Sequence, residues 1–365
     1  MRIIVKLGTS TLTNGSSRLS PPLIIELVRQ IARLQSQGHQ MVLVSSGAIA
    51  AGREKLNFPQ LPKFIPAKQM LAAIGQPRLM AFYEQIFGLF GLTVAQILLT
   101  RSDLSHRRRY LNARNTLTAL LQQNVIPIIN ENDTVATEEI RVGDNDNLSA
   151  LTANLIDADT LILLTDQDGL FSADPNTNPD AELIQNVRGE QIPKTVWQAA
   201  GGSNSDLGTG GMITKIQAAD LARRSGTMCI IANGKEPDVL IRLTNDENIG
   251  TRFEPVTEIV ESRKRYILSA RSASGRLTVD HGAAKAMQRG GSLLSVGVVA
   301  ISGTFKRSEV VRVTDTDGRE VARGITNYDS RDLARILRRR SDDIESILGY
   351  HYGDEVIHRN DLVLV

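Results

Sequence analysis

The stretch Met41-Val42-Leu43-Val44-Ser45-Ser46-Gly47-Ala48-Ile49-Ala50-Ala51-Gly52 shows the pattern that decides the fold. An apolar run passes through a short polar turn into the start of a helix, and similar runs recur between longer segments of helical period. Such runs are typical of parallel strands buried on both faces. The predicted strands are Ile3–Leu7, Met41–Val44, Thr93–Leu99, Val125–Ile129, Thr160–Leu164 and Thr227–Ala232. The predicted helices are Ile24–Gln37, a segment from the N-cap candidate Ser105 to Gln123, Leu148–Asp157 and Met212–Arg224. This alternation predicts an α/β fold, a three-layer α/β/α sandwich with a mainly parallel sheet.

The pattern changes after Gly250. The predicted strands become short and have the character of an antiparallel sheet; they are Tyr266–Ser269, Ser292–Ser302, Val310–Thr314 and Glu320–Gly324. An Asp-Thr-Asp-Gly turn joins the last two strands. A short polar connection, Ser262 to Lys264, separates the two regions. We therefore predict two domains, residues 1–260 and residues 265–365, the second small and mostly β with one or two helices.

Composition excludes several classes of protein. The chain has 365 residues, of which 41% are hydrophobic and 22% charged, as in globular proteins. No stretch approaches the roughly 20 apolar residues of a membrane span, and no signal-peptide core follows Met1, so we expect a cytoplasmic protein without membrane contact. The single cysteine, Cys229, excludes an internal disulfide, and the five histidines lack zinc-ligand spacing.

The net charge of +2 is unevenly distributed. Residues 263–365 carry 18 Lys and Arg against 13 Asp and Glu, whereas residues 1–262 carry 24 against 27. A basic excess of this size permits contact with nucleic acid, but a solvated charged surface is the commoner explanation. RNA binding is thus possible but not expected.

Polar residues gather where predicted strands end, which is where open α/β sheets bind ligands. Lys6 interrupts the first strand and is followed by Gly8, Thr9 and Ser10. Because an unpaired buried ammonium is costly, Lys6 either emerges toward an anion or reaches solvent at a sheet edge. The second junction, Ser45–Gly52, either offers a helix N-terminus to an anion or needs small residues for tight helix–strand packing.

The third junction is the densest in polar groups. Asn130-Glu131-Asn132-Asp133 follows a strand, and Gly143-Asp144-Asn145-Asp146-Asn147-Leu148-Ser149-Ala150 opens a helix. Asp144 or Asp146 could serve as an N-cap, and the spacing does not fit an EF-hand. We favour a polar substrate pocket over a simple turn.

The fourth junction is Gly208-Thr209-Gly210-Gly211-Met212-Ile213-Thr214-Lys215, a glycine-rich loop entering a helix. Together with Leu164-Thr165-Asp166, it indicates nucleotide-phosphate binding. It is neither a Walker A motif nor a dinucleotide fingerprint, and protein-kinase motifs are missing. No histidine accompanies these junctions as a general base, which suits a carboxylate acceptor that is already ionised at neutral pH.

Together these motifs resemble the glutamate 5-kinase branch of the amino acid kinase family, and the resemblance spans essentially the whole chain. The motifs are Val5–Ser10, Ser45–Gly52, Asn130–Asp133, Gly143–Ala150 and Gly208–Lys215. The motifs Val5–Ser10 and Ser45–Gly52 are shared across amino acid kinases. The motif Gly143–Ala150, when it is combined with a PUA-like C-terminal region, is specific to this branch. From about Arg265 through Gly349–Gly353 the chain resembles a PUA domain, a small β-barrel known from RNA-modifying proteins.

The resemblance implies ATP-dependent phosphorylation of the γ-carboxylate of L-glutamate to L-glutamyl 5-phosphate, the first step of proline biosynthesis. It implies that Lys6 and Lys215 stabilise the transferring phosphoryl group while Asp146 orients both lysines. The implied glutamate-binding residues are Ser46, Asp133 and Asn145. The implied ATP-binding residues are Lys6, Thr165, Asp166, Thr209, Gly210, Gly211, Met212, Ile213, Thr214 and Lys215. Mg²⁺ is expected with the nucleotide, and we predict no protein ligand for it.

Members of this family are commonly homo-oligomers, dimers or tetramers, and are inhibited by proline, so both properties are expected from the resemblance alone. Two rival interpretations remain open. The chain could be an amino acid kinase for another carboxylate, such as aspartate or N-acetylglutamate. It could also be an RNA-binding protein whose kinase-like half is a scaffold, although the presence of Lys6, Lys215 and Asp146 argues against this.

Overall fold

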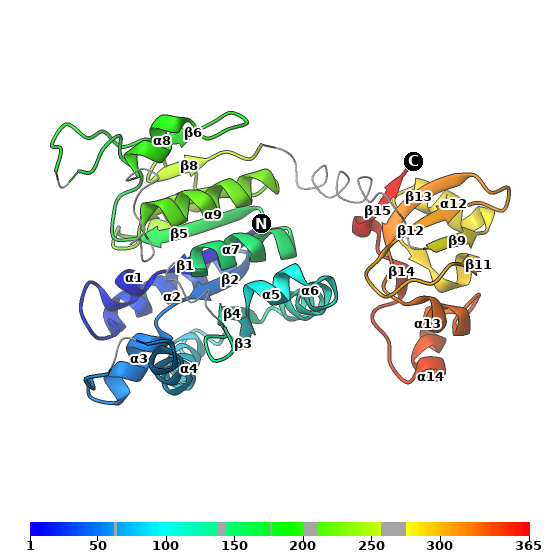
Figure 1. The fold of residues 1–365 in the computed structure, drawn as a ribbon, viewed down its shortest axis with the longest axis horizontal. Helices are drawn as coiled ribbons and strands as arrows, with labels where there is room; N and C mark the ends of the chain where they lie inside the picture. The colour runs from blue at the N-terminus through cyan, green and yellow to red at the C-terminus, as the bar shows by residue number, and fades with distance from the viewer. Residues whose placement is uncertain (62–63, 137–143, 176, 201–210, 257–274) are drawn as a thin grey trace. The chain divides into compact units, whose positions relative to one another are not determined.

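The computed structural model describes the chain except for residues 62–63, 137–143, 176, 201–210 and 257–274. The chain divides into two compact units, Met1–Glu258 and Ile259–Val365 (Figure 1). The polar connection predicted between the two domains lies outside the described residues. The domain limits that we set at residues 260 and 265 therefore stay predictions.

The described part of the first unit contains an eight-stranded sheet with the strand order β3-β4-β2-β1-β5-β7-β8-β6. The strands are β1 (Arg2–Leu7), β2 (Gln40–Ser45), β3 (Val94–Leu99), β4 (Ile126–Glu131), β5 (Thr160–Thr165), β6 (Asn186–Val187), β7 (Met228–Asn233) and β8 (Thr251–Phe253). The six strands from β3 to β7 in this order are parallel, and β8 pairs antiparallel with β7. This confirms the predicted α/β class and the mainly parallel sheet.

Helices cover both faces of this sheet. They are α1 (Thr9–Thr13), α2 (Pro21–Ser36), α3 (Ala48–Lys55), α4 (Ile65–Gly88), α5 (Arg101–Ser105), α6 (Arg107–Gln122), α7 (Asp144–Ile156), α8 (Lys194–Ala199), α9 (Met212–Arg224) and α10 (Val239–Thr244). Ile4 of β1 belongs to a core with residues of α6, α7 and α9, whereas Ile3 and Val5 belong to a core with residues of α2, α4 and α10. This alternation follows from the two-residue period of a strand and confirms the three layers.

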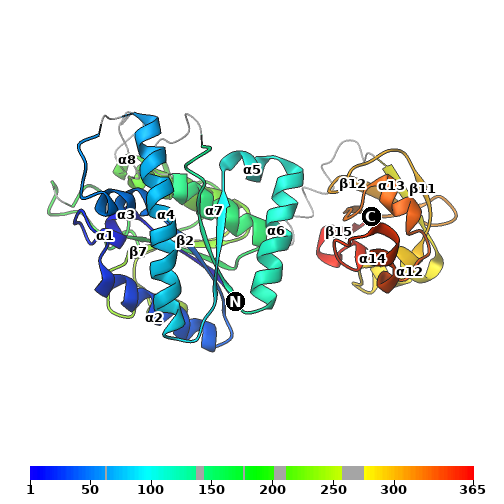
Figure 2. The same cartoon turned by 90° about the horizontal axis from the view of Figure 1, so that it is seen from below.

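One predicted helix start was wrong in this unit, and the short strands β6 and β8 and the long helix α4 were not predicted. Ser105 is the last residue of α5 and not an N-cap, because Thr100 and Asp103 form a capping box that begins α5 as a separate short helix. His106 is the N-cap of α6. The long helix α4 was not predicted at all (Figure 2). It contains Gly75 and Pro77, residues that usually mark helix ends.

The described part of the second unit contains a five-stranded sheet, β11-β9-β12-β13-β15, and the pair β10-β14. The strands are β9 (Gly275–Val279), β10 (Leu293–Leu294), β11 (Val298–Ser302), β12 (Val310–Thr314), β13 (Glu320–Ile325), β14 (Glu355–Ile357) and β15 (Leu362–Leu364). The helices are α12 (His281–Gln288), α13 (Ser330–Arg335) and α14 (Ile344–Leu348), with 3₁₀ turns η1 (Ser295–Gly297), η2 (Ser341–Asp343) and η3 (Arg359–Asp361). This strand-rich unit has its own apolar core and confirms a small, mostly β second domain.

Several details of this unit differ from the sequence prediction. The interior strand β9, which lies between β11 and β12, was missed, and its pairing with β12 is parallel. The run Ser292–Ser302 is interrupted by η1. The predicted strand Tyr266–Ser269 lies outside the described residues. The predicted turn between β12 and β13 is present, and its Gly318 has a φ of +81°, a conformation that favours glycine.

Within the described ranges, no helix combines the length and the apolar character that a membrane crossing requires.

Candidate active site

Four strand ends meet at one edge of the first unit's sheet. The register pairs Lys6 of β1 with Val44 of β2 on one side and with Leu163 of β5 on the other. After β4 the chain passes through α7 and enters β5, which lies on the opposite side of β1 from β4. The order of the strands therefore reverses around β1, and such a point in an open α/β sheet is where ligands bind.

A buried network of charges lies at this edge. Nζ of Lys6 is 2.5 Å from Oδ1 of Asp146, and Nζ of Lys215 is 3.5 Å from Oδ2 of the same carboxylate. The hydroxyl of Thr214 donates to Oδ2 of Asp146 at 2.7 Å. Asp146 is fully buried, and Lys6 and Lys215 are 5% and 6% exposed. Two ammonium groups thus share one carboxylate, which leaves an excess of positive charge in a nearly dry site.

The strand period explains how Lys6 reaches this network. Ile4 faces the layer of α7 and α9, and side chains two residues apart along a strand share a face, so Lys6 faces these helices too. α7 supplies Asp146, and α9 supplies Lys215. β1 lies between β2 and β5, so the alternative in which Lys6 reaches solvent at a sheet edge was wrong.

The network perturbs the proton affinities of its members. Burial alone would raise the pKa of Asp146, but the ammonium groups of Lys6 and Lys215 and the hydrogen bonds outweigh it and hold this pKa below its usual value. Burial lowers the pKa of Lys215, the charge of Lys6 lowers it further, and Asp146 opposes both. The carboxylate is therefore unsuited to act as a proton acceptor and suited to hold two cations in place.

A second polar network lies beside the first. Nδ2 of Asn145, the residue before Asp146, donates to Oγ of Ser46 at 2.9 Å and to Oδ1 of Asn130 at 3.1 Å. Nδ2 of Asn130 in turn donates to Oε1 of Gln76 at 2.8 Å. The predicted substrate residues Ser46 and Asn145 thus come together. α7 begins at Asp144, so Asp146 lies inside the first turn and is not its N-cap.

Two acceptor groups in this region are well placed for a cationic group. Oδ1 of Asn145 is buried and accepts no hydrogen bond within the described part of the chain. Asp133, in the segment after β4, is half-buried, and desolvation raises the pKa of its carboxyl to about 6. Among the described residues this carboxylate has no cationic partner. Both groups would gain from an ammonium ligand, because an opposite charge or a donor would offset the cost of burial.

Close helix packing fixes the backbone around Ser46. Gly47, the N-cap of α3, has a φ of +97°, which a residue with a side chain rarely adopts. A Cβ on Gly75 of α4 would lie 1.8 Å from the carbonyl oxygen of Ala48, and one on Gly52 would lie 2.0 Å from that of Leu71. The small residues of Ser45–Gly52 are therefore required for packing, but against a helix and not against a strand as predicted.

The predicted nucleotide residues occupy the other side of β1. Thr165 ends β5 and is 6% exposed, and Asp166 after it is exposed. Gly211 is the N-cap of α9 and has no side chain to cap the first-turn amides of that helix. Met212 and Ile213 are half-buried in this first turn. Thr209 and Gly210 lie outside the described residues.

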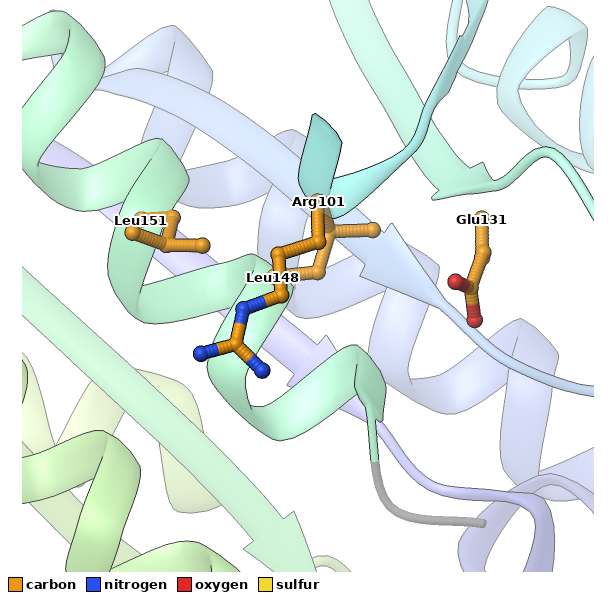
Figure 3. A pocket seen from close by; sticks show the side chains of 4 residues that line it. All are labelled: Arg101, Glu131, Leu148 and Leu151. Atoms are coloured by element: carbon orange, nitrogen blue, oxygen red, sulfur yellow. The ribbon is translucent and has the colours of Figure 1, made fainter. Parts of the chain in front are cut away.

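Sequence reasoning missed several residues of the site. Gln76 lies on the helix that was not predicted, so no sequence signal pointed to it. A pocket beside α7 is lined by Arg101, Glu131, Leu148 and Leu151 (Figure 3). Glu131 and Leu148 belong to the third junction of the sequence analysis, whereas Arg101 and Leu151 were missed. Arg101 follows β3 and Glu131 ends β4. Arg101 was therefore predictable in the same way as Glu131, as a residue near a strand end.

The described residues contain no group of three or more His, Cys, Asp or Glu side chains that could hold a metal ion. Mg²⁺ in nucleotide sites is usually held by one or two carboxylates together with the phosphates. The part of the chain that the structure describes therefore builds no dedicated metal site.

Comparisons with known proteins place this geometry in a family. The model of the amino acid kinase family matches residues 1–233, and the PUA domain model matches residues 275–348. The glutamate 5-kinase of Photobacterium profundum is 55% identical over 364 residues, which cover 100% of this chain and 96% of the relative. Those of Shewanella oneidensis and Sodalis glossinidius are 54% and 55% identical, with coverage of 100% and 99% of this chain and 98% of each relative. The chain, with its C-terminal PUA domain, therefore belongs to the glutamate 5-kinases of the amino acid kinase family.

Proposed function

We propose that the chain transfers the γ-phosphoryl group of ATP to the side-chain carboxylate of L-glutamate, giving L-glutamyl 5-phosphate and ADP, the first step of proline biosynthesis. The observation that carries the proposal is the buried network of Lys6, Asp146 and Lys215 at the strand ends. An excess of fixed positive charge in a site shielded from water stabilises the charge of a transferring phosphoryl group.

The chemistry requires no general base from the protein. The glutamate carboxylate has a pKa of about 4.3 and is ionised at neutral pH. Its oxygen attacks the γ-phosphorus, and the bond from this phosphorus to the β,γ-bridging oxygen breaks, so no proton is transferred. Lys6 and Lys215 bind the phosphoryl oxygens, and Asp146 holds the two ammonium groups in position.

The two substrates occupy opposite sides of β1 in this proposal. Ser46, Asp133 and Asn145 bind glutamate, with Asp133 and Oδ1 of Asn145 receiving its ammonium group. The residues proposed to bind ATP are Lys6, Thr165, Asp166 and Gly211 through Lys215, and also Thr209 and Gly210 of the preceding loop. Gly211 supplies no side-chain cap to the first-turn amides of α9, which supports phosphate binding at this helix N-terminus.

Four further properties belong to the proposal because of the family. Mg²⁺ would enter with the nucleotide and would neutralise charge on the phosphates. Proline is proposed as a feedback inhibitor, and a dimer or tetramer as the working assembly. The cytoplasm is the proposed compartment.

A coupled assay of ADP release tests the function. We expect release to depend on L-glutamate and to be at least tenfold slower with aspartate, N-acetylglutamate or water as the acceptor. Faster release with N-acetylglutamate would contradict the proposed recognition of an ammonium group. Release that is independent of any amino acid would contradict the proposed reaction.

A further inference from the structure

Thr214 occupies a position that phosphate binding does not explain. Its side-chain oxygen is 2.7 Å from Oδ2 of Asp146, whereas Nζ of Lys215 is 3.5 Å from the same oxygen. The hydroxyl and the ammonium thus approach one carboxylate oxygen, and the hydroxyl is the nearer of the two. The other oxygen, Oδ1, receives Lys6 at 2.5 Å.

The proton of this hydroxyl has two acceptors within reach. Oγ1 of Thr214 is also 2.8 Å from the carbonyl oxygen of Gly211, one turn earlier in α9. A hydroxyl donates only one hydrogen bond, and an ionised acceptor gives the stronger one. The proton therefore goes to Asp146, and the contact reaches from the first turn of α9 to the first turn of α7.

The distances determine what this contact does for Lys215. Close ammonium–carboxylate hydrogen bonds are about 2.7–2.9 Å long, so the contact of Lys215 with Asp146 is a long one. The hydroxyl of Thr214 is the closer donor to Oδ2, at 2.7 Å. The ammonium of Lys215 is therefore attracted by the carboxylate but stays 3.5 Å from Oδ2 and forms no close ion pair with it. Loss of the hydroxyl would let Lys215 close onto Oδ2 and away from the transferring phosphoryl group.

We propose that Thr214 is a positioning residue, whose hydroxyl caps Asp146 and thereby holds Lys215 in the geometry that phosphoryl transfer needs. The inference rests on the proposed function of Lys215 in this reaction. It assigns the side chain of Thr214 to the carboxylate of Asp146, which leaves the backbone amide of this residue for the proposed contact with the nucleotide.

The test compares Thr214→Val, which removes the hydroxyl and keeps the branched shape, with Thr214→Ser, which keeps the hydroxyl. Thr152→Val is the matched control, because Thr152 is a buried threonine of α7 whose hydroxyl has no hydrogen-bond partner among the described residues. We expect Thr214→Val to lower kcat at least tenfold while both KM values stay within threefold. Thr214→Ser should retain most of the parent kcat, and Thr152→Val should leave it unchanged.

The dependence of kcat on pH provides a second measurement. General destabilisation of the protein would not shift the pH at which kcat changes. A closer pair between Lys215 and Asp146 raises the pKa of Lys215. The alkaline limb of the kcat profile should therefore move to higher pH in Thr214→Val and stay in place in Thr214→Ser. If Thr214→Val does not fold, Thr214→Ala, which suits a helix better, should give the same result.

The outcomes separate the inference from the proposed function. A parent without glutamate-dependent ADP release contradicts the proposed function, and the inference falls with it. If the parent is active, a higher KM for ATP with an unchanged kcat in Thr214→Val would make Thr214 a nucleotide ligand and overturn the inference. Equal losses in Thr214→Ser and Thr214→Val would overturn it as well.

Discussion

Lys6 and Asp146 come from different layers of the sandwich and meet at 2.5 Å in a site closed to solvent. One belongs to the central strand, and the other to the helix that crosses over it. Burying two charged groups costs desolvation free energy, which is offset only where the geometry of the pair is good. A buried pair with poorer geometry indicates that the charge serves a function. Here Lys215 contacts the same carboxylate, so Lys6, Asp146 and Lys215 together carry a net positive charge. This charge can stabilise a transferring phosphoryl group.

Replacing Asp146 with Asn should destabilise the ligand-free protein. The substitution leaves two buried ammonium groups without their counter-charge, and breaking a buried pair in this way typically costs about 3–5 kcal/mol. The free energy of unfolding of the first unit, measured with urea and Trp197 fluorescence, should fall by an amount in this range. Asp246→Asn is the matched control, because its carboxylate pairs with Arg252 while 88% exposed, and it should cost less than about 1 kcal/mol. Equal effects of the two substitutions would contradict the structural role of Asp146.

The KM for glutamate should rise as the pH is lowered from 7.5 to 5.5. Burial raises the pKa of Asp133 to about 6, so the carboxyl becomes protonated in this window and loses its attraction for the substrate ammonium. The glutamate side chain, with a pKa of about 4.3, stays ionised throughout. The increase should approach tenfold per pH unit below 6, and Asp133→Asn should have a higher KM that does not change over the same window. A flat profile in the parent protein would show that Asp133 does not bind the ammonium.

Ser308 should limit the stability of the second unit. Its φ of +82° is unfavourable for a serine, and its buried hydroxyl has no hydrogen-bond partner in the part of the chain that the structure describes. Ser308→Gly should therefore increase local stability by about 1 kcal/mol, the balance of relieved strain and greater unfolded-state entropy. The hydrogen-exchange rates of the β12 amides should fall by the factor that corresponds to this gain in stability.

Ser308→Ala separates the two causes in this experiment. Alanine removes the hydroxyl but keeps the Cβ at a positive φ, so its gain should be smaller than that of glycine. Exchange that is faster in Ser308→Gly than in the parent would show that the serine side chain stabilises this turn.

The sequence predicted six of the eight strands in the described sheet, and missed the short strands β6 and β8. Continuous apolar runs identified the parallel strands, and Lys6 stood out because a charge at the end of a buried strand needs a partner. The role of Asp146 beside the lysines was implied by the family resemblance. The contact of Lys6 with Asp146 follows from topology, since the carboxyl ends of parallel strands meet at one edge.

Other features could not be read from the sequence. α4 was missed because Gly75 and Pro77 resemble helix breakers, whereas Gly75 is required by the close approach of Ala48. The contact of Thr214 with Asp146 depends on the relative placement of α7 and α9, which no local pattern encodes. The role of Thr209 and Gly210 stays a prediction, because these residues lie outside the described part of the chain.

The most direct test of the account is the kcat for glutamate-dependent ADP release after Lys215→Ala. Loss of one preorganised charge donor typically lowers kcat by roughly two to three orders of magnitude, and we predict a loss of this size in a variant that keeps the parent's circular dichroism and cooperative unfolding. Lys285→Ala, on an exposed position of α12 in the second unit, is the matched control and should retain the parent kcat. An unchanged kcat in folded Lys215→Ala would contradict the assignment of phosphoryl transfer to the buried network of Lys6, Asp146 and Lys215.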